Sequence, residues 1–278
     1  MSPITLPDPA DKWIVGMIHL PSLPGAAQGH DRTMDEIIEF ACRDARALAD
    51  GGMDAILLQN AQDHPPRKTV PSATVAAYAV VAAAVRRATD LPLGISVLKS
   101  DPAASLAIAL AADARFVRLK SYVGAEVGAE GLVEGCAADT VRIRRELGAE
   151  RQIEIWADAI QPTSKPLGGA SVAELASWCV DFGQADRVIV TGGSLEESIQ
   201  FVAQARSRVG VPVILGGGAE PANARRALEA SDGIIVGRFL RGRSLAGPVF
   251  DTLVRAVVDA ARASPDARAE QTTGAALG

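Results

Sequence analysis

The sequence has few cysteines, few aromatic residues and few lysines, and it lacks any block of basic residues. Its three cysteines, Cys42, Cys136 and Cys179, are odd in number and widely separated, which argues against a disulfide framework and indicates a reducing compartment. The net charge is −5 and no run of Lys and Arg marks one face. Nucleic acid is therefore not expected as a partner.

Long apolar runs are also absent. The longest, residues 75–85, is rich in alanine and suits a buried helix. It is too short to cross a bilayer, which takes about 20 residues. The first residues have no cationic start followed by an apolar stretch, so no secretory signal is expected. These features predict a cytoplasmic protein without integral membrane contact.

Several common cofactor and metal motifs are missing. No Walker, Rossmann or zinc-ligand spacing occurs anywhere in the chain. Asp63 and His64 are adjacent candidate metal ligands, but two such residues without a recognised spacing do not define a site. We therefore expect neither a cofactor nor a bound metal ion.

What the sequence does contain is a regular alternation of eight short apolar runs with eight helical patterns. This alternation is typical of repeated β-α units around a parallel sheet. With 278 residues, the chain matches the usual size of a (β/α)8 TIM barrel, about 250 residues. We expect one barrel domain over residues 1–264, followed by a flexible tail over residues 265–278. An open doubly wound sheet is the alternative, but eight even units favour closure.

The expected elements can be given as residue ranges. The strands are expected at 13–19, 55–60, 93–98, 116–120, 153–158, 187–191, 211–216 and 233–236. The helices are expected at 34–50, 72–89, 102–112, 137–147, 172–182, 195–209, 221–230 and about 248–263.

Glycines follow the last two expected strands. Gly217 and Gly218 come after the seventh strand, and Gly237 with Arg238 comes after the eighth. Without a Cβ, glycine lets backbone N–H groups approach a ligand closely. Loops seven and eight of this fold commonly bind phosphate together. A phosphorylated small molecule is therefore the expected ligand. Three more residues after the sixth strand could extend this site: Thr191, Gly192 and Gly193.

Candidate catalytic residues lie at the expected strand ends. His19 ends the first strand and Asp158 the fifth, while Lys99 and Lys120 each occur in a Leu-Lys-Ser segment. We interpret Asp158 as a general acid or base whose pKa is set by Lys120, with His19 as a second acid or base. A polar plug that merely fills the barrel, with lysine tips in solvent, is the alternative interpretation.

Side-chain alternation predicts internal ion pairs. Glu154 and Asp158 share one face of the fifth strand, and Arg118 and Lys120 share one face of the fourth. A buried charge needs a partner. We therefore expect an Arg118–Glu154 pair beneath a Lys120–Asp158 pair at the barrel mouth, meaning the carboxyl ends of the strands.

Two loops are longer than a barrel requires. Residues 61–71 follow the second strand, and residues 121–135 follow the fourth. Long loops of this kind are often lids or binding loops. Asn60, Asp63 and His64 lie at the start of the first of these loops, where they could bind the hydroxyl groups of a sugar.

Together these residues resemble the BtpA family. The resemblance begins with Gly-Met-Ile-His-Leu-Pro at residues 16–21 and covers residues 14–258. It continues through Leu23–Gly25, Gln59–Asn60, Gly131–Gly135, Ala157–Asp158, Val190–Gly192, Gly216–Gly218 and Ile235–Gly237. The resemblance implies a (β/α)8 barrel similar to phosphate-binding enzymes. It also implies an alternative, a non-catalytic scaffold associated with photosystem I biogenesis.

The chain departs from the family pattern at the candidate site. Gln59 stands where a glutamate is common, and Lys120 where an asparagine is common. A histidine-rich run after the strand-five aspartate is absent, and Gly128-Ala129 replaces a Thr-Asp pair. Lys120 is a specific gain and Asp158 is retained, which favours a changed substrate over lost activity.

The expectation from the sequence is a metal-independent, homo-oligomeric barrel enzyme. Its substrate is a phosphorylated sugar or a nucleotide-like metabolite. The reaction is either isomerisation or the cleavage or formation of a glycosidic or C–C bond. The non-catalytic assembly or regulatory scaffold remains the alternative.

Overall fold

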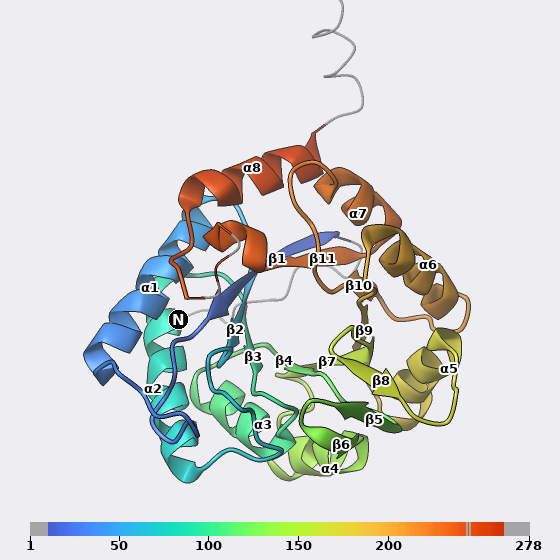
Figure 1. Cartoon of the computed structure of the whole chain (residues 1–278), viewed down its shortest axis with the longest axis horizontal. Coiled ribbons are helices and arrows are strands. Elements are labelled where there is room, and N and C mark those ends of the chain that lie inside the picture. The colour runs from blue at the N-terminus through green and yellow to red at the C-terminus, as the bar shows by residue number, and fades with distance from the viewer. Residues whose placement is uncertain (1–10, 243, 245, 264–278) are drawn as a thin grey trace, which may run out of the picture.

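A computed structural model describes residues 11–242, 244 and 246–263, and its centre is a closed barrel of eight parallel strands (Figure 1). The (β/α)8 prediction is confirmed. The barrel closes where Trp13 of the first strand pairs with Gly233 of the last. In barrel order the strands are β1 (Trp13–His19), β11 (Gly233–Val236), β10 (Val213–Leu215), β9 (Arg187–Val190), β7 (Glu154–Ile160), β4 (Phe116–Leu119), β3 (Leu93–Ser96) and β2 (Ala55–Gln59).

Helices surround this barrel as an outer ring (Figure 1). None of those in the described part of the chain is long and apolar enough to cross a membrane. The expected tail, residues 265–278, lies outside the described residues. The α-helices are α1 (Met34–Asp50), α2 (Ser72–Ala88), α3 (Pro102–Ala111), α4 (Ala137–Glu146), α5 (Val172–Ser177), α6 (Leu195–Arg206), α7 (Ala224–Ala230) and α8 (Asp251–Arg262).

Two helical segments differ from the expectation. The helix expected over residues 172–182 changes at Trp178 into a π-helix, η1 (Trp178–Phe182). The helix expected to start at Pro221 starts at Ala224 instead. The reason is a turn, in which the amide of Glu220 donates to Asn223 Oδ1 at 2.9 Å and Pro221 lies between the two. A short 3-10 helix, η2 (Arg238–Arg241), follows β11.

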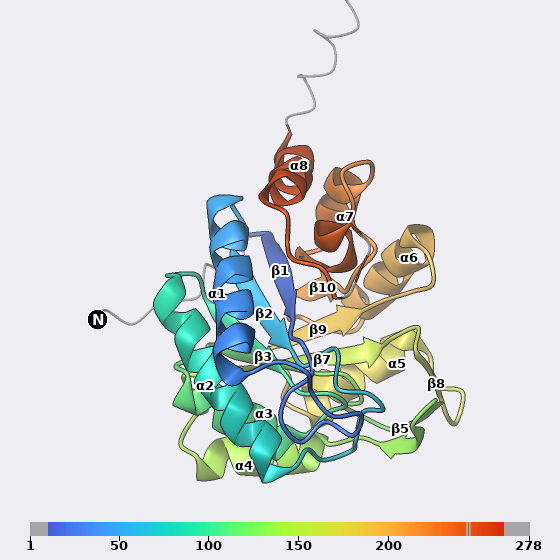
Figure 2. The same cartoon turned by 60° about the vertical axis from the view of Figure 1, so that its left-hand side comes forward.

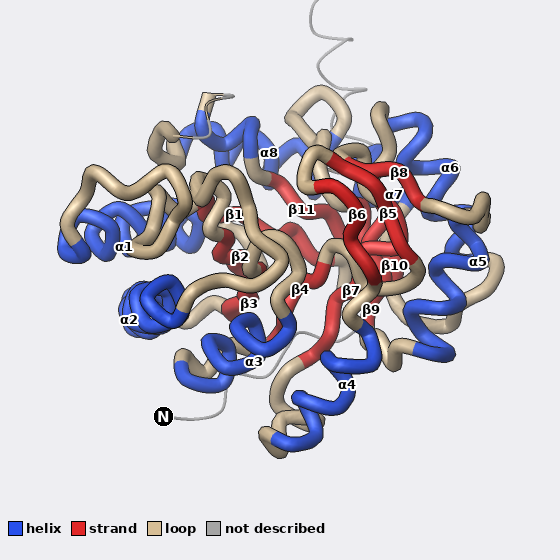
Figure 3. The backbone as a smooth tube through the Cα atoms, turned by 60° about the horizontal axis from the view of Figure 1, so that its bottom comes forward, coloured by secondary structure: helices blue, strands red, loops and turns tan. Residues whose placement is uncertain are grey.

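A second, smaller sheet was not expected from the sequence. It contains β5 (Ala125–Gly128), β6 (Gly131–Glu134) and β8 (Ser164–Pro166), paired antiparallel in the order β6-β5-β8. The long loop after β4 therefore forms a hairpin, to which the loop after β7 adds a strand. Figure 2 shows β5 and β8 beside the barrel, and Figure 3 shows the three strands lying together. This small sheet joins two neighbouring loops of the barrel mouth into one unit.

Apolar side chains form two clusters because they alternate along each strand. One cluster fills the space between strands and helices. The other lies inside the barrel, where Phe116 stacks on Trp156 with 4.0 Å between ring centroids. A Cβ on Gly94 would lie 2.1 Å from the Phe116 ring, so glycine is needed there. The inner cluster contains Trp13, Val15, Met17, Ala55, Leu57, Phe116, Trp156, Ile189, Ile214 and Ile235.

A buried arginine closes the amino-terminal end of the barrel. The Arg187 guanidinium lies 4.6 Å from the Trp13 ring and 5.2 Å from the Trp156 ring, and its Nε donates to Glu154 at 3.0 Å. Trp156 Nε1 also donates to the Glu154 carboxylate, at 2.7 Å. The predicted Arg118–Glu154 pair is therefore wrong. Arg187 on β9 and Arg118 on β4 both pair in register with Trp156. The Arg187 side chain reaches down to Glu154, whereas Arg118 reaches toward the mouth and contacts Asp158.

Replacing Glu154 with alanine should destabilise the protein, because it leaves the buried Arg187 guanidinium without its counter-ion. Loss of one partner of a buried ion pair costs about 3 kcal/mol or more. Urea unfolding measures this loss. Glu146→Ala is the matched control, because it breaks the exposed Arg142–Glu146 pair on α4 and should change stability by only about 0.5 kcal/mol. Equal effects of the two substitutions would contradict this account of the barrel floor.

Candidate functional site at the barrel mouth

Polar side chains replace apolar ones at the last inward-facing position of several strands. Above the inner apolar cluster lie His19 of β1, Gln59 of β2, Ser96 of β3 and Arg118 of β4, with Asp158 on β7. Gln59 Nε2 donates to Ser96 Oγ at 3.1 Å. Because parallel strands end at the same edge, these groups gather at the end where such barrels hold their active sites.

The strongest contact at the mouth is the ion pair between Arg118 and Asp158. Arg118 Nε donates to Asp158 Oδ1 at 3.0 Å, and Nη2 donates to Oδ2 at 2.9 Å. Both side chains are buried. Burial raises the pKa of Asp158, and the Arg118 guanidinium opposes that rise. The predicted Lys120–Asp158 pair is therefore wrong, because the longer Arg118 side chain reaches this carboxylate from one layer below.

Lys120 follows β4 directly and is half-buried at the mouth. Its backbone is fixed, because the amides of Lys120 and Ser121 both donate to Ser100 Oγ, at 3.1 and 2.8 Å. Its Nζ makes no ion pair or hydrogen bond with another described residue. Burial and the charge of Arg118 lower the pKa of Lys120 to about 8. About a tenth of this lysine is therefore unprotonated at pH 7, far more than for a lysine with the ordinary pKa.

His19 is only 6% exposed, and its Nδ1 has no hydrogen-bond partner among the described residues. Its ring lies against the next loop, where a Cβ on Gly237 would be 3.1 Å from His19 Cε1. Burial, followed by the positive charges of Arg241, Lys120, Arg118 and Arg238, lowers the pKa of His19 to about 3. The imidazole is thus neutral in a cationic setting, where an anionic ligand would be favoured.

The predicted glycine loop after β11 lies against this histidine, and the other glycine loop follows the neighbouring strand β10. Gly217 and Gly218 have φ angles of 125° and 81°, and a Cβ on either would meet no atom within 4 Å. Neither amide donates a hydrogen bond to another described residue. Arg238 follows Gly237 and is exposed. These loops therefore combine open backbone N–H groups with an exposed positive charge, a combination suited to an anionic ligand.

A second buried ion pair, which the sequence analysis missed, holds the last of these loops in place. Arg241 Nη2 lies 2.7 Å from Asp44 Oδ2, and both side chains are fully buried. The pair ties η2 to α1, while Asp44 Oδ1 also accepts from the amide of Val249 at 3.2 Å. Asp44 and Arg241 are too far apart in the sequence for any local pattern to reveal their pairing.

The residues after β9, Thr191, Gly192 and Gly193, make hydrogen bonds to other groups of the protein. Gly192 N–H donates to Ser198 Oγ at 2.9 Å, and Gly193 N–H donates to the Glu197 carboxylate at 2.6 Å. Thr191 Oγ1 donates to the carbonyl of Gly216 at 2.8 Å, which braces the neighbouring glycine loop. A phosphate at Gly193 would have to displace the Glu197 carboxylate.

Asn60 and Asp63 both connect loops of the mouth. Asn60 Nδ2 donates to Asp63 Oδ2 at 2.9 Å, and Asn60 Oδ1 accepts from the amide of Leu98 at 2.8 Å. Asp63 Oδ1 accepts from the amide of Leu23 at 2.9 Å. Both side chains are buried, so this pair ties together the loops after β1, β2 and β3. His64 is exposed beside them.

Lys99 also holds a loop in place. Its buried Nζ donates to Glu130 at 3.1 Å and lies 3.4 Å from Glu126. Glu126 accepts further hydrogen bonds from Ser121 Oγ and from Gln161 Nε2, the latter at 2.9 Å. Lys99 therefore anchors the β5–β6 hairpin to the barrel through two carboxylates. Glu126 and Glu130 were not predicted as site residues, because the hairpin that places them beside Lys99 was not expected from the sequence.

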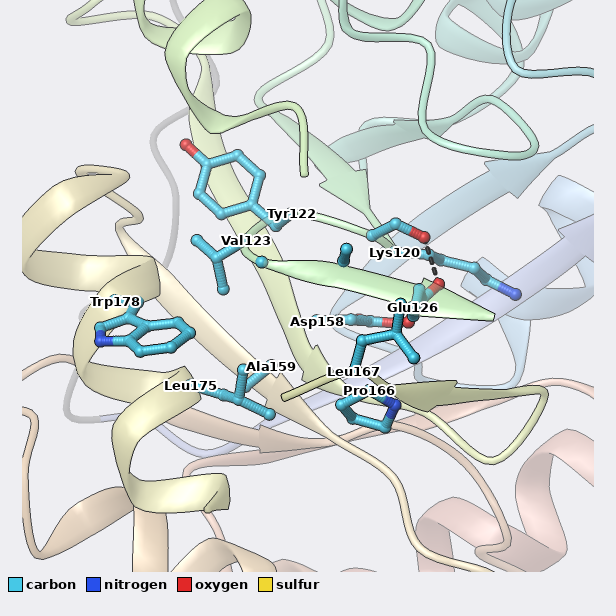
Figure 4. Close-up of a pocket in the computed structure, with 13 residues that line it drawn as sticks. Lys120, Tyr122, Val123, Glu126, Asp158, Ala159, Pro166, Leu167, Leu175 and Trp178 are labelled. Carbon is cyan, nitrogen blue, oxygen red and sulfur yellow. Dashed lines mark hydrogen bonds between the residues drawn. The ribbon is translucent and has the colours of Figure 1, made fainter. Parts of the chain in front are cut away.

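A pocket leads from the mouth beneath this hairpin. Figure 4 shows Lys120, Glu126 and Asp158 at one side of it, with Trp178 and Leu175 at the other. The pocket is lined by residues of the barrel, the small sheet, α5 and η1. In residues 11–263, apart from 243 and 245, no group of three or more His, Cys, Asp or Glu side chains is arranged to hold a metal ion.

The closed parallel barrel with helices between its strands makes this chain a (β/α)8 barrel protein whose polar side chains gather at the carboxyl ends of the strands. It belongs to the BtpA family, whose model matches residues 10–263. A relative from Pyrococcus horikoshii, described as an uncharacterised protein, is 37% identical over 84% of this chain and 90% of its own length. The photosystem I biogenesis protein BtpA of Synechocystis is 31% identical over 89% of this chain and 87% of its own length.

Solved structures with the same fold are enzymes. Tryptophan synthase from M. tuberculosis matches with a TM-score of 0.60 and 16% identity, covering 92% of this chain and 95% of that one. N-(5'-phosphoribosyl)anthranilate isomerase from Pyrococcus furiosus matches with a TM-score of 0.54 and 12% identity, covering 91% and 100%. Thiamine phosphate pyrophosphorylase from Pyrococcus furiosus matches with a TM-score of 0.53 and 17% identity, covering 92% and 98%. At these identities the likeness establishes the fold alone.

The lowered pKa of His19 predicts a specific pH dependence of stability. The folded-state pKa is about 3 and the ordinary value is 6.5. Between these values the unfolded chain binds the proton and the folded chain does not. Stability from this group is therefore fully present above pH 6.5 and falls as the pH drops toward 3, by about 1.4 kcal/mol per unit.

Chemical unfolding of the parent protein and of His19→Gln between pH 7.5 and 4.5 measures this effect. The carboxylates contribute equally to both proteins, so the difference between the two curves reports His19. We expect the parent to lose more stability on acidification than His19→Gln does. Parallel curves would show that His19 titrates normally.

Proposed function

We propose that this protein is an enzyme that binds a phosphorylated metabolite at the barrel mouth and acts on it by acid–base chemistry. One observation carries the proposal. The buried Nδ1 of His19 lacks a hydrogen-bond partner among the described residues, and the His19 ring lies against the Gly237 loop. Buried polar groups in native structures are normally satisfied, so an unpaired nitrogen at the mouth, with several positive charges acting on its ring, points to an anionic ligand.

The phosphate would bind Gly217, Gly218, Gly237 and Arg238. Arg238 supplies a positive charge and the glycines supply backbone donors. Thr191 braces this site from β9, whereas Gly192 and Gly193 would join it only if the Glu197 side chain moved away.

Asp158, Lys120 and His19 are the groups placed to move protons on the rest of the substrate. Asp158 has a raised pKa and Lys120 a lowered one, and opposite shifts of this kind are typical of acid–base pairs. Arg118 is the partner that orients Asp158. We assign positioning roles to Asn60, Asp63 and Lys99, because each holds a loop of the mouth in place. His64, the remaining predicted catalytic residue, is exposed and is assigned no positioning role.

The reaction classes that suit this site are isomerisation and the cleavage or formation of a glycosidic or C–C bond. Two of the structural neighbours carry phosphate in the names of their reactions, which supports a phosphorylated substrate. A sugar phosphate or a nucleotide-like metabolite is the proposed substrate, with its phosphate at the glycine loops and its reacting part near β4, on the opposite side of the barrel.

Thermal unfolding with a panel of sugar phosphates, nucleotides and their unphosphorylated counterparts tests phosphate binding. A ligand that binds only the folded state adds about 2.7 kcal/mol of stability at one hundred times its Kd. We expect the Tm to rise only with phosphorylated compounds. Gly218→Asp should abolish the rise, because its carboxylate would repel the phosphate.

The matched control is Gly148→Asp. Gly148 also has a positive φ, 64°, and open space around an added Cβ, but it lies between α4 and β7 at the opposite end of the barrel. Both substitutions therefore carry similar backbone strain, and only Gly218→Asp should remove the ligand effect. The absence of any phosphate-dependent rise in the parent protein would refute the proposed site.

Once a compound from the panel is turned over, Asp158→Asn should lower kcat by about a hundredfold or more, the usual contribution of a general acid or base. Glu134→Gln, on the exposed side of β6, should leave turnover unchanged. Circular dichroism would confirm that both variants fold. Full turnover by Asp158→Asn would remove this residue from the catalytic mechanism.

A specific observation also favours the second candidate, a non-catalytic scaffold. Large apolar side chains are exposed on the small sheet and on η1, and the Synechocystis relative is named as a photosystem I biogenesis protein. Val127 and Leu132 are paired across β5 and β6, and Leu167 and Trp178 line the pocket beneath the same hairpin. The scaffold function would be favoured if the protein bound no phosphorylated compound and if Asp158→Asn left its fold and stability unchanged.

A further inference from the structure

The two Leu-Lys-Ser segments have the same sequence but opposite surroundings. Lys99 is buried against two carboxylates, 3.1 Å from Glu130 and 3.4 Å from Glu126. Lys120 is half-buried at the mouth, and its Nζ contacts no carboxylate within the described residues. Its nearest charged neighbour along the strand is Arg118, whose guanidinium is held toward the mouth by Asp158.

This contrast separates an anchoring lysine from a reactive one. Ion pairs with two carboxylates hold the Lys99 amine against the β5–β6 hairpin. Burial and the Arg118 charge favour the neutral amine of Lys120, whose pKa falls to about 8. Partly desolvated lysines next to another cation are the ones that act as nucleophiles toward carbonyl groups.

We propose that Lys120 forms an imine with the aldehyde or ketone group of a small phosphorylated metabolite. This inference rests on the proposed function, because the phosphate of the same molecule would bind the glycine loops. It narrows the substrate class to a carbonyl compound and assigns Lys120 a covalent role.

The geometry of the mouth supports a substrate that spans it. Lys120 ends β4, and the glycine loops follow β10 and β11, on the other side of the closed barrel. His19 ends β1, the strand next to β11, and the charges of both Lys120 and Arg238 act on it. A phosphate at the glycine loops would leave the carbonyl carbon free to approach Lys120.

The chemistry balances with the groups present. The neutral amine of Lys120 attacks the carbonyl carbon, the C–N bond forms, and the carbonyl electron pair moves to oxygen. The Asp158 carboxylate takes a proton from the new ammonium nitrogen and passes it to this oxygen, which gives a neutral carbinolamine. The nitrogen electron pair then forms the C=N bond as the C–O bond breaks. Asp158 carries the remaining N–H proton to the leaving oxygen, so the products are a neutral imine, water and the unchanged carboxylate. Each Asp158 oxygen accepts one hydrogen bond from Arg118 and keeps a second lone pair for this proton.

Reductive trapping tests the proposal. The full chain is incubated with dihydroxyacetone phosphate or glyceraldehyde 3-phosphate and sodium borohydride, which reduces an imine to a stable secondary amine. Intact-mass and peptide mass spectrometry then locate the adduct. We expect one adduct, on Lys120, that forms less with unphosphorylated dihydroxyacetone and is lost in Lys120→Met and Lys120→Arg.

Lys165→Met is the matched control, because Lys165 is an exposed lysine of β8, and it should keep the adduct. Unchanged labelling of either Lys120 variant, or labelling spread over exposed lysines, would overturn the proposal. A phosphate-dependent rise in Tm without an adduct on Lys120 would refute the imine alone. The absence of both the Tm rise and the adduct would refute the proposed function as well.

Discussion

The bidentate pair between Arg118 and Asp158 is the contact on which the barrel mouth depends. It joins β4 to β7 at the level where the apolar interior ends, with both charges out of water. A guanidinium in this position fixes the carboxylate in one orientation, since its two donors match the two oxygens. It also leaves Lys120, one layer above, without the carboxylate that would otherwise keep it charged. The reactivity assigned to Lys120 thus depends on the absence of an ion pair between Lys120 and Asp158.

The loops around this pair are held by buried polar contacts and not by apolar packing alone. Asn60 and Asp63 fasten the loops on one side of the mouth, Lys99 fastens the hairpin, and the Asp44–Arg241 pair fastens η2. Buried polar groups are costly unless they are paired, so each contact favours one arrangement of its loop. The open glycine amides are the exception within this framework. The unpaired glycine amides are therefore available to a ligand, whereas the paired polar groups hold the loops in place.

The barrel itself could be predicted from the sequence, because apolar runs and helical periodicity are local properties. The ranges of β1, β11 and α1 were predicted to the residue. The ion pairs inside the barrel could not be predicted, since alternation places Arg118 and Glu154 on inward faces without saying how far each side chain extends. Arg187 on the neighbouring strand was therefore overlooked as the partner of Glu154. The hairpin was missed because its two short runs, residues 125–128 and 131–134, surround Ala129-Glu130, which is not one of the Asn-Gly, Asp-Gly or Gly-X pairs that mark two-residue hairpin turns.

The small sheet has a consequence for how this barrel can change over time. In most barrels of this class each loop can be lengthened or exchanged separately, because it contacts its own strand and helix. Here β8, from the loop after β7, pairs with β5, from the loop after β4. An insertion in one loop shifts the strand register of the other, so the two must vary as a single inherited unit. Anyone grafting a new specificity onto this scaffold would have to transplant both segments together.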